Sequence, residues 1–358
     1  MYHTEIKKRI RTNGLLHSIM LELTYKCNLD CFFCYNDTSL QGQQMRLAHY
    51  EKLLDDLVDL QVLFVTLTGG EPLLHPDFFE IGRAAKERGF VIRVKSGGHC
   101  IAGRIARRLK KEVNPFQLQI SLHGATAATH ERQTQVAGSF QQLIENIHYM
   151  KELDLRPTLI STLTLWNENE IEAMYELADS LGLTLTFQGP VGPKDDGDTE
   201  PLQIQPSTSA WENLRRVQKE RQASGIQTRN EYEPAEKESP EDESGLYCGL
   251  GTEQVMVDPY GSVYPCLHVR RSAGNLHDID IKSIWSKSSV FSQALDLNKK
   301  AAVRKKENKD LSILGTPMFC PGLELRGCAS DTGCSGGGCG SSLNQELQKE
   351  ALPNITLV

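Results

Sequence analysis

Residues 15–34 read LLHSIMLELTYKCNLDCFFC, an apolar stretch that runs directly into three closely spaced cysteines. The apolar part, 15–23, has the length and composition of a buried β-strand. Cys27, Cys31 and Cys34 follow it on one loop, and their short spacing allows three thiolates to bind one metal centre. Thiolates are the usual ligands of iron–sulfur clusters, and zinc is the main alternative because it also binds cysteine.

The same loop has no nearby fourth cysteine. Closed structural zinc sites use four protein ligands, so three ligands leave a coordination position open. An open iron is what a catalytic cluster needs if a substrate or cofactor must bind to it. The spacing therefore predicts an iron–sulfur cluster with one accessible iron at the end of the first strand.

Strand-like and helical segments alternate through the first half of the chain. Short apolar segments predict six strands, at residues 15–23, 63–68, 90–94, 116–122, 155–163 and 183–187. Helical spacing predicts helices at residues 47–60, 78–88, 100–111, 139–153 and 168–181, the fourth with Ser139 as its N-cap. This order predicts an α/β fold, a partial (β/α)6 TIM-like barrel, because a full barrel needs eight units. Ligands of such parallel arrays bind at the carboxyl ends of the strands.

A second motif, Gly69-Gly70-Glu71-Pro72, directly follows the second predicted strand. Glycine lets the backbone approach a ligand closely, and a carboxylate can pair with an ammonium group. An isolated tetrapeptide of this kind is usually a turn. After the cysteine loop, at this separation, it predicts a binding segment at the same edge of the sheet.

With these two motifs the chain resembles radical S-adenosylmethionine (SAM) enzymes, in which an aromatic residue, here Phe33, precedes the third cysteine. The resemblance implies that Cys27, Cys31 and Cys34 bind a [4Fe–4S] cluster whose fourth iron chelates SAM. An electron from the cluster then cleaves SAM to methionine and a 5′-deoxyadenosyl radical, which abstracts a hydrogen atom.

The resemblance also implies further contacts with SAM. Gly69, Gly70 and Glu71 match the segment that contacts the methionine amino group, Ser121 matches a position near the ribose, and Arg132 matches one that pairs with the methionine carboxylate. For Ser121 and Arg132 the alternatives are an ordinary strand-end serine and a helix-surface arginine. We expect the nearby His123 and Cys100 to be structural residues.

The remaining cysteines lie towards the C-terminus. Cys248 and Cys266 flank two short apolar segments separated by the turn sequence Asp258-Pro259-Tyr260-Gly261, which predicts a β-hairpin. Four more follow at positions 320, 328, 334 and 339, the last two around a glycine-rich stretch. Together these segments resemble the SPASM extension of radical SAM enzymes, which carries auxiliary iron–sulfur clusters.

The second half of this extension departs from the family pattern. Leu325 stands where the pattern has a cysteine, Cys320 lies five residues earlier, and no cysteine follows Cys339. Two four-iron clusters need eight ligands, and this region has six cysteines, so the sequence is compatible with either one or two auxiliary [4Fe–4S] clusters. The resemblance assigns Cys248, Cys266 and Cys339 to the nearer cluster, and Cys320, Cys328 and Cys334 to the farther one.

The composition limits the classes of protein to which the chain can belong. The 358 residues include 39% hydrophobic ones, enough for a buried core. No apolar run of about 18 residues predicts a membrane span, and residues 1–11 lack the apolar core of a signal peptide. We therefore expect a cytoplasmic protein, in which clustered cysteines indicate metal ligands rather than disulfides. The net charge of −7 argues against nucleic-acid binding.

Shifts in composition divide the chain into four predicted regions. They are a radical SAM partial barrel at 1–190, a connector at 191–244, a SPASM-like auxiliary domain at 245–340 and a tail at 341–358. We expect the connector to be mobile, with one helix at 207–223 that places Trp211, Leu214 and Val217 on one face, and with a solvated acidic run.

SPASM-bearing enzymes mostly modify peptides, and GPVGPKDDGDTEPL at 189–202 resembles the connector of pyrroloquinoline quinone and mycofactocin maturases. The resemblance implies hydrogen abstraction from a ribosomally made peptide, followed by crosslinking or oxidation. Few residues precede the first strand, so we expect any leader-peptide-binding protein to act in trans, and an electron donor such as flavodoxin or ferredoxin. The alternatives are a SAM-dependent dehydrogenase or maturase of a sugar alcohol or protein side chain, similar to sulfatase maturases, and a zinc-stabilised binding module.

Overall fold

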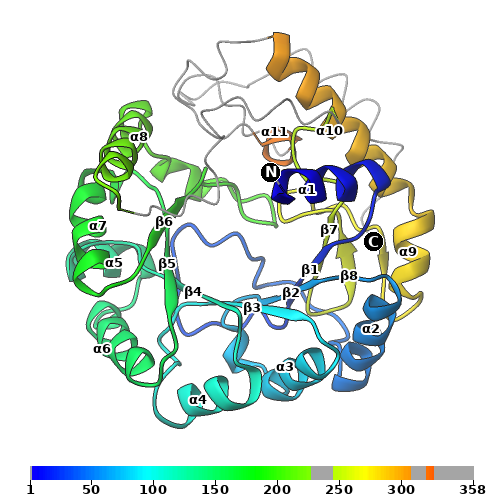
Figure 1. The fold of residues 1–358 in the computed structure, drawn as a ribbon, viewed down its shortest axis with the longest axis horizontal. Coiled ribbons are helices and arrows are strands. Elements are labelled where there is room, and N and C mark those ends of the chain that lie inside the picture. Colours follow the sequence, from blue (N-terminus) through cyan, green and yellow to red (C-terminus); the bar gives the residue numbers. More distant parts are fainter. Residues whose placement is uncertain (1, 227–244, 308–319, 326–358) are drawn as a thin grey trace.

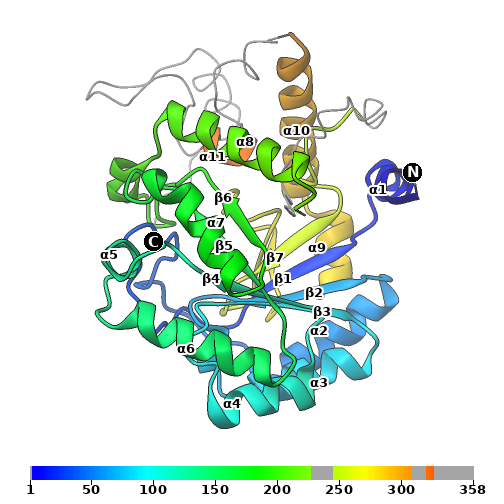
Figure 2. The ribbon, with the colours of Figure 1, turned by 60° about the vertical axis from the view of Figure 1, so that its left-hand side comes forward.

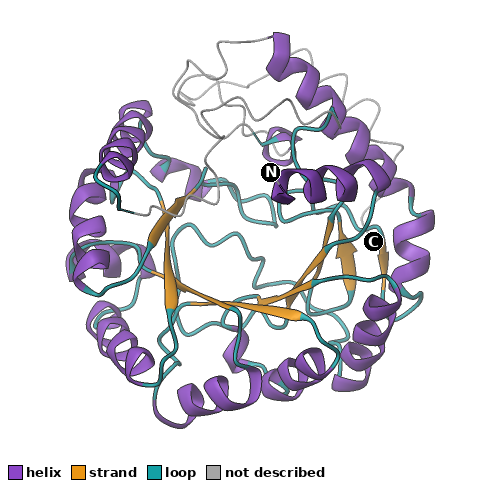
Figure 3. Cartoon of the chain, viewed as in Figure 1, coloured by secondary structure: helices purple, strands orange, loops and turns teal. Residues whose placement is uncertain are grey.

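The computed structural model describes residues 2–226, 245–307 and 320–325. A nine-stranded sheet of order β6-β5-β4-β3-β2-β1-β7-β8-β9 forms its centre. The sheet curves into an arc, and most of the helices lie outside this arc (Figures 1 and 3). The predicted α/β fold with a parallel sheet and a partial barrel is therefore confirmed.

The predicted strands form the parallel part of the sheet, and each lies beside the strand that precedes it in the chain. They are β1 (Ser18–Glu22), β2 (Phe64–Thr68), β3 (Val91–Ser96), β4 (Gln117–Ser121), β5 (Pro157–Thr162) and β6 (Leu185–Gln188). The helices between them are α2 (Leu47–Asp59), α3 (Phe78–Glu87), α4 (Gly103–Arg108), α5 (Ala127–Thr134), α6 (Ser139–Glu152) and α7 (Ile171–Ser180). Short 3-10 turns span Pro72–Leu74 and Glu168–Glu170, and a π-helical turn at Leu109–Val113 continues α4.

The two faces of the parallel strands have opposite character because side chains alternate along a strand. The outward face packs on the helices with buried apolar residues, among them Ile19, Leu21, Val65, Leu67, Val94, Ile120 and Leu159. On the inward face the register aligns polar residues: Glu22 with Thr68, Lys95 with Gln119, and Gln119 with Thr158. The arc therefore has an apolar outer wall and a polar inner wall.

The helices pack through the faces that the sequence predicts. In α2 the apolar residues Tyr50, Leu53, Leu54 and Leu57 recur at helical spacing, and all four are buried. Burying each such side chain contributes roughly 1.5–3 kcal/mol. This face holds α2 against the sheet. The loop after β1 runs inside the arc, where it is drawn in blue (Figure 1).

The predicted hairpin forms, and it continues the sheet. Strands β7 (Gln254–Val257) and β8 (Ser262–Tyr264) pair antiparallel, and the short strand β9 (Gly274–Asn275) adds to β8. β7 also pairs parallel with β1, with Ser18 opposite Gln254. The C-terminal region is thus attached to the barrel through backbone hydrogen bonds along β1.

The remaining helices complete the ring. They are α1 (Tyr2–Asn13), α8 (Thr208–Ala223), α9 (Ile281–Lys287), α10 (Ser289–Glu307) and the short α11 (Pro321–Leu325), with a 3-10 turn at Glu200–Ile204. Both ribbon views place α8, α10 and α11 on the side opposite α3 and α4 (Figures 1 and 2).

Three expectations differ from the structure. The helix expected from residue 100 begins only at Gly103, and α6 is capped by Gly138 with φ +78°, whereas Ser139 is its first helical residue and bonds to Thr134. The connector, which we expected to be mobile, is packed at Val191 and along α8, where Trp211, Leu214 and Val217 are buried. Residues 227–244, which include the acidic run, lie outside the described residues.

Within the described part of the chain, no helix is long and apolar enough to cross a membrane.

Candidate functional site

The loop that carries Cys27, Cys31 and Cys34 follows β1 at the carboxyl edge of the sheet, and Cys27 lies five residues after the strand ends. Its shape is set by backbone hydrogen bonds. Asp30 and Phe32 donate their N–H groups to the carbonyls at the end of α5, and Cys34 donates to the Cys31 carbonyl at 2.9 Å. The end of α5 therefore holds the three predicted ligands in a turn that faces the inside of the arc.

The three thiols lie close enough to interact electrostatically. Burial raises the pKa of Cys31 most, and the neighbouring Cys34 and Cys27 raise it further. Burial raises the pKa of Cys34 to about 11 and also raises that of Cys27. The backbone N–H of Leu29 donates to the Cys27 sulfur at 3.4 Å. A bound cation is needed to hold such thiols as thiolates.

Cys100 provides a contrast close by. Burial raises its pKa to about 11, and the charges of Glu71 and Cys27 raise it further, while no backbone N–H of the described residues lowers it. Backbone hydrogen bonds do lower the pKa of Cys27 and Cys34. Hydrogen bonds to the sulfurs are one way in which proteins tune iron–sulfur clusters, so the loop cysteines fit a cluster and Cys100 fits the structural role that we expected.

Among the described residues, no three His, Cys, Asp or Glu side chains converge closely enough to hold a single metal ion. A four-iron cluster does not need such convergence, because each thiolate binds a different iron. The donor set of three interacting thiols with backbone N–H donors therefore fits the implied cluster. Its ligand roles stay predictions.

Gly69 and Gly70 join the end of β2 to the cysteine loop. Gly69 has φ +133°, and a Cβ there would clash with the Thr24 carbonyl, while one on Gly70 would clash with the Lys26 carbonyl. Gly70 and Glu71 instead donate N–H bonds to those two carbonyls, at 2.7 and 2.9 Å. Only glycine permits this approach, which places the predicted SAM-binding segment against the chain that leads into Cys27.

Glu71 is fully buried and bonds within the protein. Its carboxylate accepts hydrogen bonds from the Ser96 hydroxyl at 2.8 Å, the Gly97 N–H at 3.0 Å and the Leu73 N–H at 3.2 Å. Burial raises the pKa of Glu71 to about 7, and these hydrogen bonds lower it only in part. The carboxylate thus links the ends of β2 and β3, and a contact with the SAM ammonium stays a prediction.

The raised pKa of Glu71 predicts a pH-dependent stability. Unfolded Glu71 ionises with its ordinary pKa, whereas folded Glu71 keeps its proton until about pH 7, so stability is lost as the pH rises. We expect wild type to lose about 2–3 kcal/mol relative to Glu71→Gln between pH 5 and pH 8. Urea unfolding at both pH values measures this difference. The exposed Glu145→Gln serves as control, and an unchanged difference for Glu71→Gln would contradict the prediction.

The other predicted SAM contacts surround the same loop. Phe33 packs edge-to-face on His123, with ring centroids 4.9 Å apart. The Arg132 guanidinium lies 4.2 Å from the ring centroid of Trp166, which itself packs on Phe32. Arg132 is exposed, and Ser121 ends β4 at the same edge. The structure therefore brings Phe33, Ser121 and Arg132 to one edge, although their roles stay predictions.

His123 has protein partners on several sides. Its carbonyl accepts bonds from the side chains of Gln133 and Asn167, and Asn167 also donates to the Thr162 carbonyl at 2.9 Å. Burial lowers the pKa of His123 to about 3, so the ring is neutral. These contacts match the structural role expected for His123 and link the ends of β4 and β5.

A buried charged network lies on the inward face and was not predicted. Both terminal nitrogens of Arg270 donate to Glu22, at 3.0 Å each, and Arg270 also pairs with Asp195 at 2.8 Å. The hydroxyls of Tyr25 and Tyr35 donate to Glu22 as well. Burial lowers the pKa of Arg270, but the two carboxylates outweigh it and hold that pKa above its usual range.

This network connects four parts of the chain: β1, the residue after Cys34, the segment after β6 and the C-terminal region. One sequence signal could have revealed half of it, because Glu22 is the single acidic residue in the apolar segment 15–23. A buried carboxylate requires a charged or hydrogen-bonding partner. The identity of that partner, Arg270, has no signal in the sequence.

Cys248, Cys266 and Cys320 are the described cysteines of the C-terminal region, and each is partly buried. The loop at Cys248 is held by Asn298 of α10, a fully buried residue. Its amide oxygen accepts from the N–H groups of Tyr247 and Cys248, and its NH₂ group donates to the carbonyls of Cys248 and Leu250, both at 2.8 Å. The predicted ligands Cys328, Cys334 and Cys339 lie outside the described residues.

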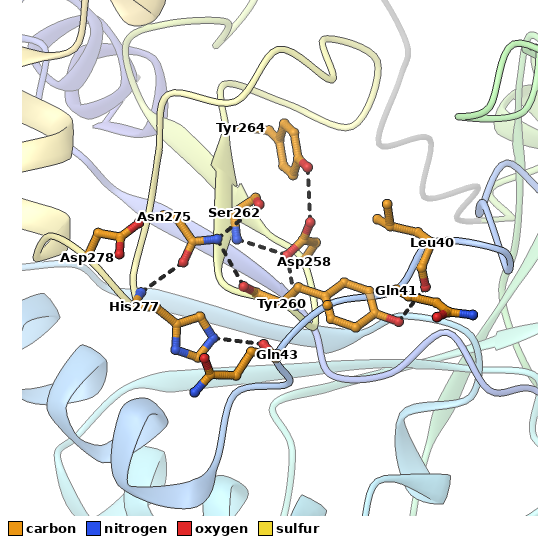
Figure 4. A pocket seen from close by; sticks show the side chains of 11 residues that line it. Leu40, Gln41, Gln43, Asp258, Tyr260, Ser262, Tyr264, Asn275, His277 and Asp278 are labelled. Atoms are coloured by element: carbon orange, nitrogen blue, oxygen red, sulfur yellow. Dashed lines mark hydrogen bonds between the residues drawn. The ribbon is translucent and has the colours of Figure 1, made fainter. Parts of the chain in front are cut away.

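A cavity of about 370 Å³ lies between the hairpin and the segment that follows the cysteine loop (Figure 4). Its polar groups bond across it: the Tyr260 hydroxyl donates to the Leu40 carbonyl, and His277 Nε2 lies 2.8 Å from the Gln43 carbonyl. Asp258 accepts bonds from the backbone of the hairpin turn and from Tyr264. These contacts fix the segment after the loop against the C-terminal region.

Two family models match the chain. Residues 21–178 match the radical SAM superfamily, and residues 248–310 match SPASM, an iron–sulfur cluster-binding domain. The first match contains the cysteine loop, the glycine segment, Ser121 and Arg132, and the second contains Cys248 and Cys266.

Curated relatives match across both regions. The AdoMet-dependent heme synthase of Methanosarcina barkeri is 27% identical, over 78% of this chain and 84% of its own. The mycofactocin maturase MftC of Mycobacterium ulcerans is 28% identical, over 76% and 75%. The PqqA peptide cyclase of Ruegeria pomeroyi is 26% identical, also over 76% and 75%.

A solved structure shares the fold. SuiB of Streptococcus suis, bound to S-adenosylmethionine, superposes with a TM-score of 0.66 at 15% identity, over 81% of this chain and 70% of its own.

Proposed function

We propose that this chain, which belongs to the radical SAM superfamily and carries a SPASM-type iron–sulfur domain, modifies a peptide by a radical reaction. It is an enzyme whose cofactors are SAM, a [4Fe–4S] cluster and auxiliary iron–sulfur clusters. When bound, the cluster and SAM together supply a 5′-deoxyadenosyl radical that abstracts a hydrogen atom. The substrate and the bond that forms are the subject of the proposal.

The observation that carries the proposal is the length of the match to maturases. The alignments with MftC and with PqqA peptide cyclase cover 282 and 284 residues, more than the barrel itself contains, so they extend into the auxiliary domain. The name of the second relative states that it acts on a peptide. Likeness in the domain next to the substrate side of the barrel supports a similar class of substrate.

The inner wall of the arc suits such a substrate. Polar side chains on β1 to β5, among them Thr68, Gln119 and Thr158, supply donors and acceptors for peptide groups. The buried ion pair of Glu22 and Arg270 lies on the same face, where β1 meets the C-terminal region. We therefore expect these inward-facing residues to bind and orient the substrate near the carboxyl edge of the strands.

We propose crosslinking or oxidation as the modification. The test is anaerobic incubation of the enzyme with SAM, dithionite and a short peptide encoded beside it, followed by mass spectrometry. We expect the peptide to lose about 2 Da, the mass of two hydrogen atoms, in step with 5′-deoxyadenosine formation. A reaction without SAM is the control. SAM cleavage with no change in peptide mass and no deuterium uptake would contradict a peptide substrate.

A second candidate is the modification of a heme precursor. The relative in Methanosarcina barkeri, an AdoMet-dependent heme synthase, is matched over the largest share of its own length among the three described above. The charge arrangement favours the peptide, because heme-type molecules carry carboxylates that need cationic partners. On the inner wall, Arg270 already pairs with Glu22 and Asp195. Arg93 lies over the Phe64 ring, and Lys95 has a partner as well. Conversion of an added porphyrin-type precursor, detected by its mass, would favour this candidate instead.

A further inference from the structure

The described cysteines of the C-terminal region come from three separate segments: the loop before β7, the end of the hairpin and the start of α11. We propose that Cys248, Cys266 and Cys320 hold one and the same auxiliary cluster. This grouping differs from the family pattern, which assigns Cys320 to the farther cluster with Cys328 and Cys334. It rests on the auxiliary clusters and not on the peptide substrate, so it can fail independently of the proposed function.

The segment that begins at Cys320 contacts the turn that begins at Cys266. Cys266 and Val269 form an isolated β-bridge, and Val269 donates its N–H to the Cys266 carbonyl at 3.3 Å. A Cβ on Gly322 would lie only 2.8 Å from the His268 Cβ and 3.1 Å from Val269 Cγ2. The segment that begins at Cys320 is therefore in van der Waals contact with the turn that begins at Cys266.

Cys248 and Cys266 share one packing environment. Both pack against the small buried cluster of Leu250, Ala294 and Leu297, as does Val269. Asn298, one residue after Leu297 on α10, is hydrogen-bonded to the N–H and the carbonyl of Cys248. Because Val269 contacts both this cluster and the start of α11, the three cysteines surround one small region.

The three sulfurs share a local environment that Cys100 lacks. Backbone N–H groups bond to each sulfur: from Leu250 to Cys248, from His268 and Val269 to Cys266, and from Leu323 and Gly322 to Cys320. The same kind of bond is made to Cys27 in the loop after β1. Backbone donors two or three residues after a cysteine stabilise a thiolate, which is the form that binds iron.

The test measures iron and thiol reactivity in the full chain after anaerobic reconstitution. We expect Cys248→Ala and Cys320→Ala each to lose about four irons, the content of one cluster, and the double variant to lose no more than either. Cys100→Ala is the matched control and should keep all iron. An additive loss in the double variant would overturn the grouping.

If the loss of one cluster also prevents another from forming, iron content alone does not distinguish the two groupings. Alkylation by iodoacetamide, mapped by mass spectrometry, distinguishes them in that case. Ligated cysteines are protected from alkylation. We expect Cys320 to become reactive in Cys248→Ser and to stay protected in Cys328→Ser, while Cys27, Cys31 and Cys34 stay protected in both. The reverse pattern at Cys320, or reactivity in both variants, overturns the assignment. Formation of 5′-deoxyadenosine is measured separately and reports on the SAM site.

Discussion

A chain with Cys31→Ala is expected to form no 5′-deoxyadenosine above the level of a reaction without enzyme. Cys31 is the middle of the three loop cysteines and the most strongly coupled to the others, because both Cys34 and Cys27 raise its pKa. Without it two protein ligands remain in place of three, which is too few to keep the cluster, so no iron is left to bind SAM. Anaerobic reaction with dithionite and SAM, followed by chromatography of the nucleoside, measures the loss. The iron content should fall by about four atoms.

The matched control is Cys100→Ala. Cys100 lies near the same site, since the charges of Cys27 and Glu71 act on it, yet it receives no stabilising backbone hydrogen bond from the described residues. It should keep the iron content and SAM cleavage of wild type. Cleavage that survives in Cys31→Ala, or that is lost equally in Cys100→Ala, would contradict the assignment of the loop as the cluster site.

Replacing Arg270 by alanine is expected to lower the free energy of unfolding by about 3–5 kcal/mol, the usual cost of removing one partner of a buried ion pair. The pair is well shielded, because the side chains of Arg270 and Glu22 are 11% and 0% exposed. The variant leaves Glu22 and Asp195 buried together without the cation that binds both. Urea unfolding followed by circular dichroism under anaerobic conditions measures the change.

The control for Arg270→Ala is Arg216→Ala on α8. Arg216 also binds two carboxylates, Glu172 and Glu220, but it is half exposed, so its loss should cost no more than about 1 kcal/mol. The deficit of Arg270→Ala should shrink as the pH falls, because burial raises the pKa of an unpaired Glu22 and the folded chain then binds a proton. Equal losses for the two variants, or a deficit that grows at low pH, would contradict the buried pair.

The parallel part of the fold was predictable because its signals are local. The apolar run at 63–68 matches β2 to within one residue, and the apolar face of α2 is buried as its helical spacing indicates. Local sequence signals predicted the structure less well at the N-terminus and at the helix caps. The segment that forms α1 is mostly polar and basic, with Tyr2, Ile6 and Ile10 as its few apolar residues. Gly138 caps α6 through a left-handed conformation that a preference for serine caps does not anticipate.

The site was predictable where one short segment contains it. The cysteine loop and Gly69-Gly70 each carry their geometry in a few residues, and the structure places them against each other. The pairing of β1 with β7 and the contact of Glu22 with Arg270 join residues far apart in the chain. Such contacts depend on how the whole sheet closes, so neither partner's neighbours in sequence indicate the other.

The link between Glu22 and Arg270 spans 248 residues of sequence, and this separation has a consequence for synthesis on the ribosome. At about 5–20 residues per second, Glu22 is added to the chain roughly 12–50 s before Arg270. During that interval β1 also lacks β7, so one edge of the nascent sheet has open hydrogen-bonding groups. The C-terminal region, once made, both neutralises the carboxylate and covers the strand edge.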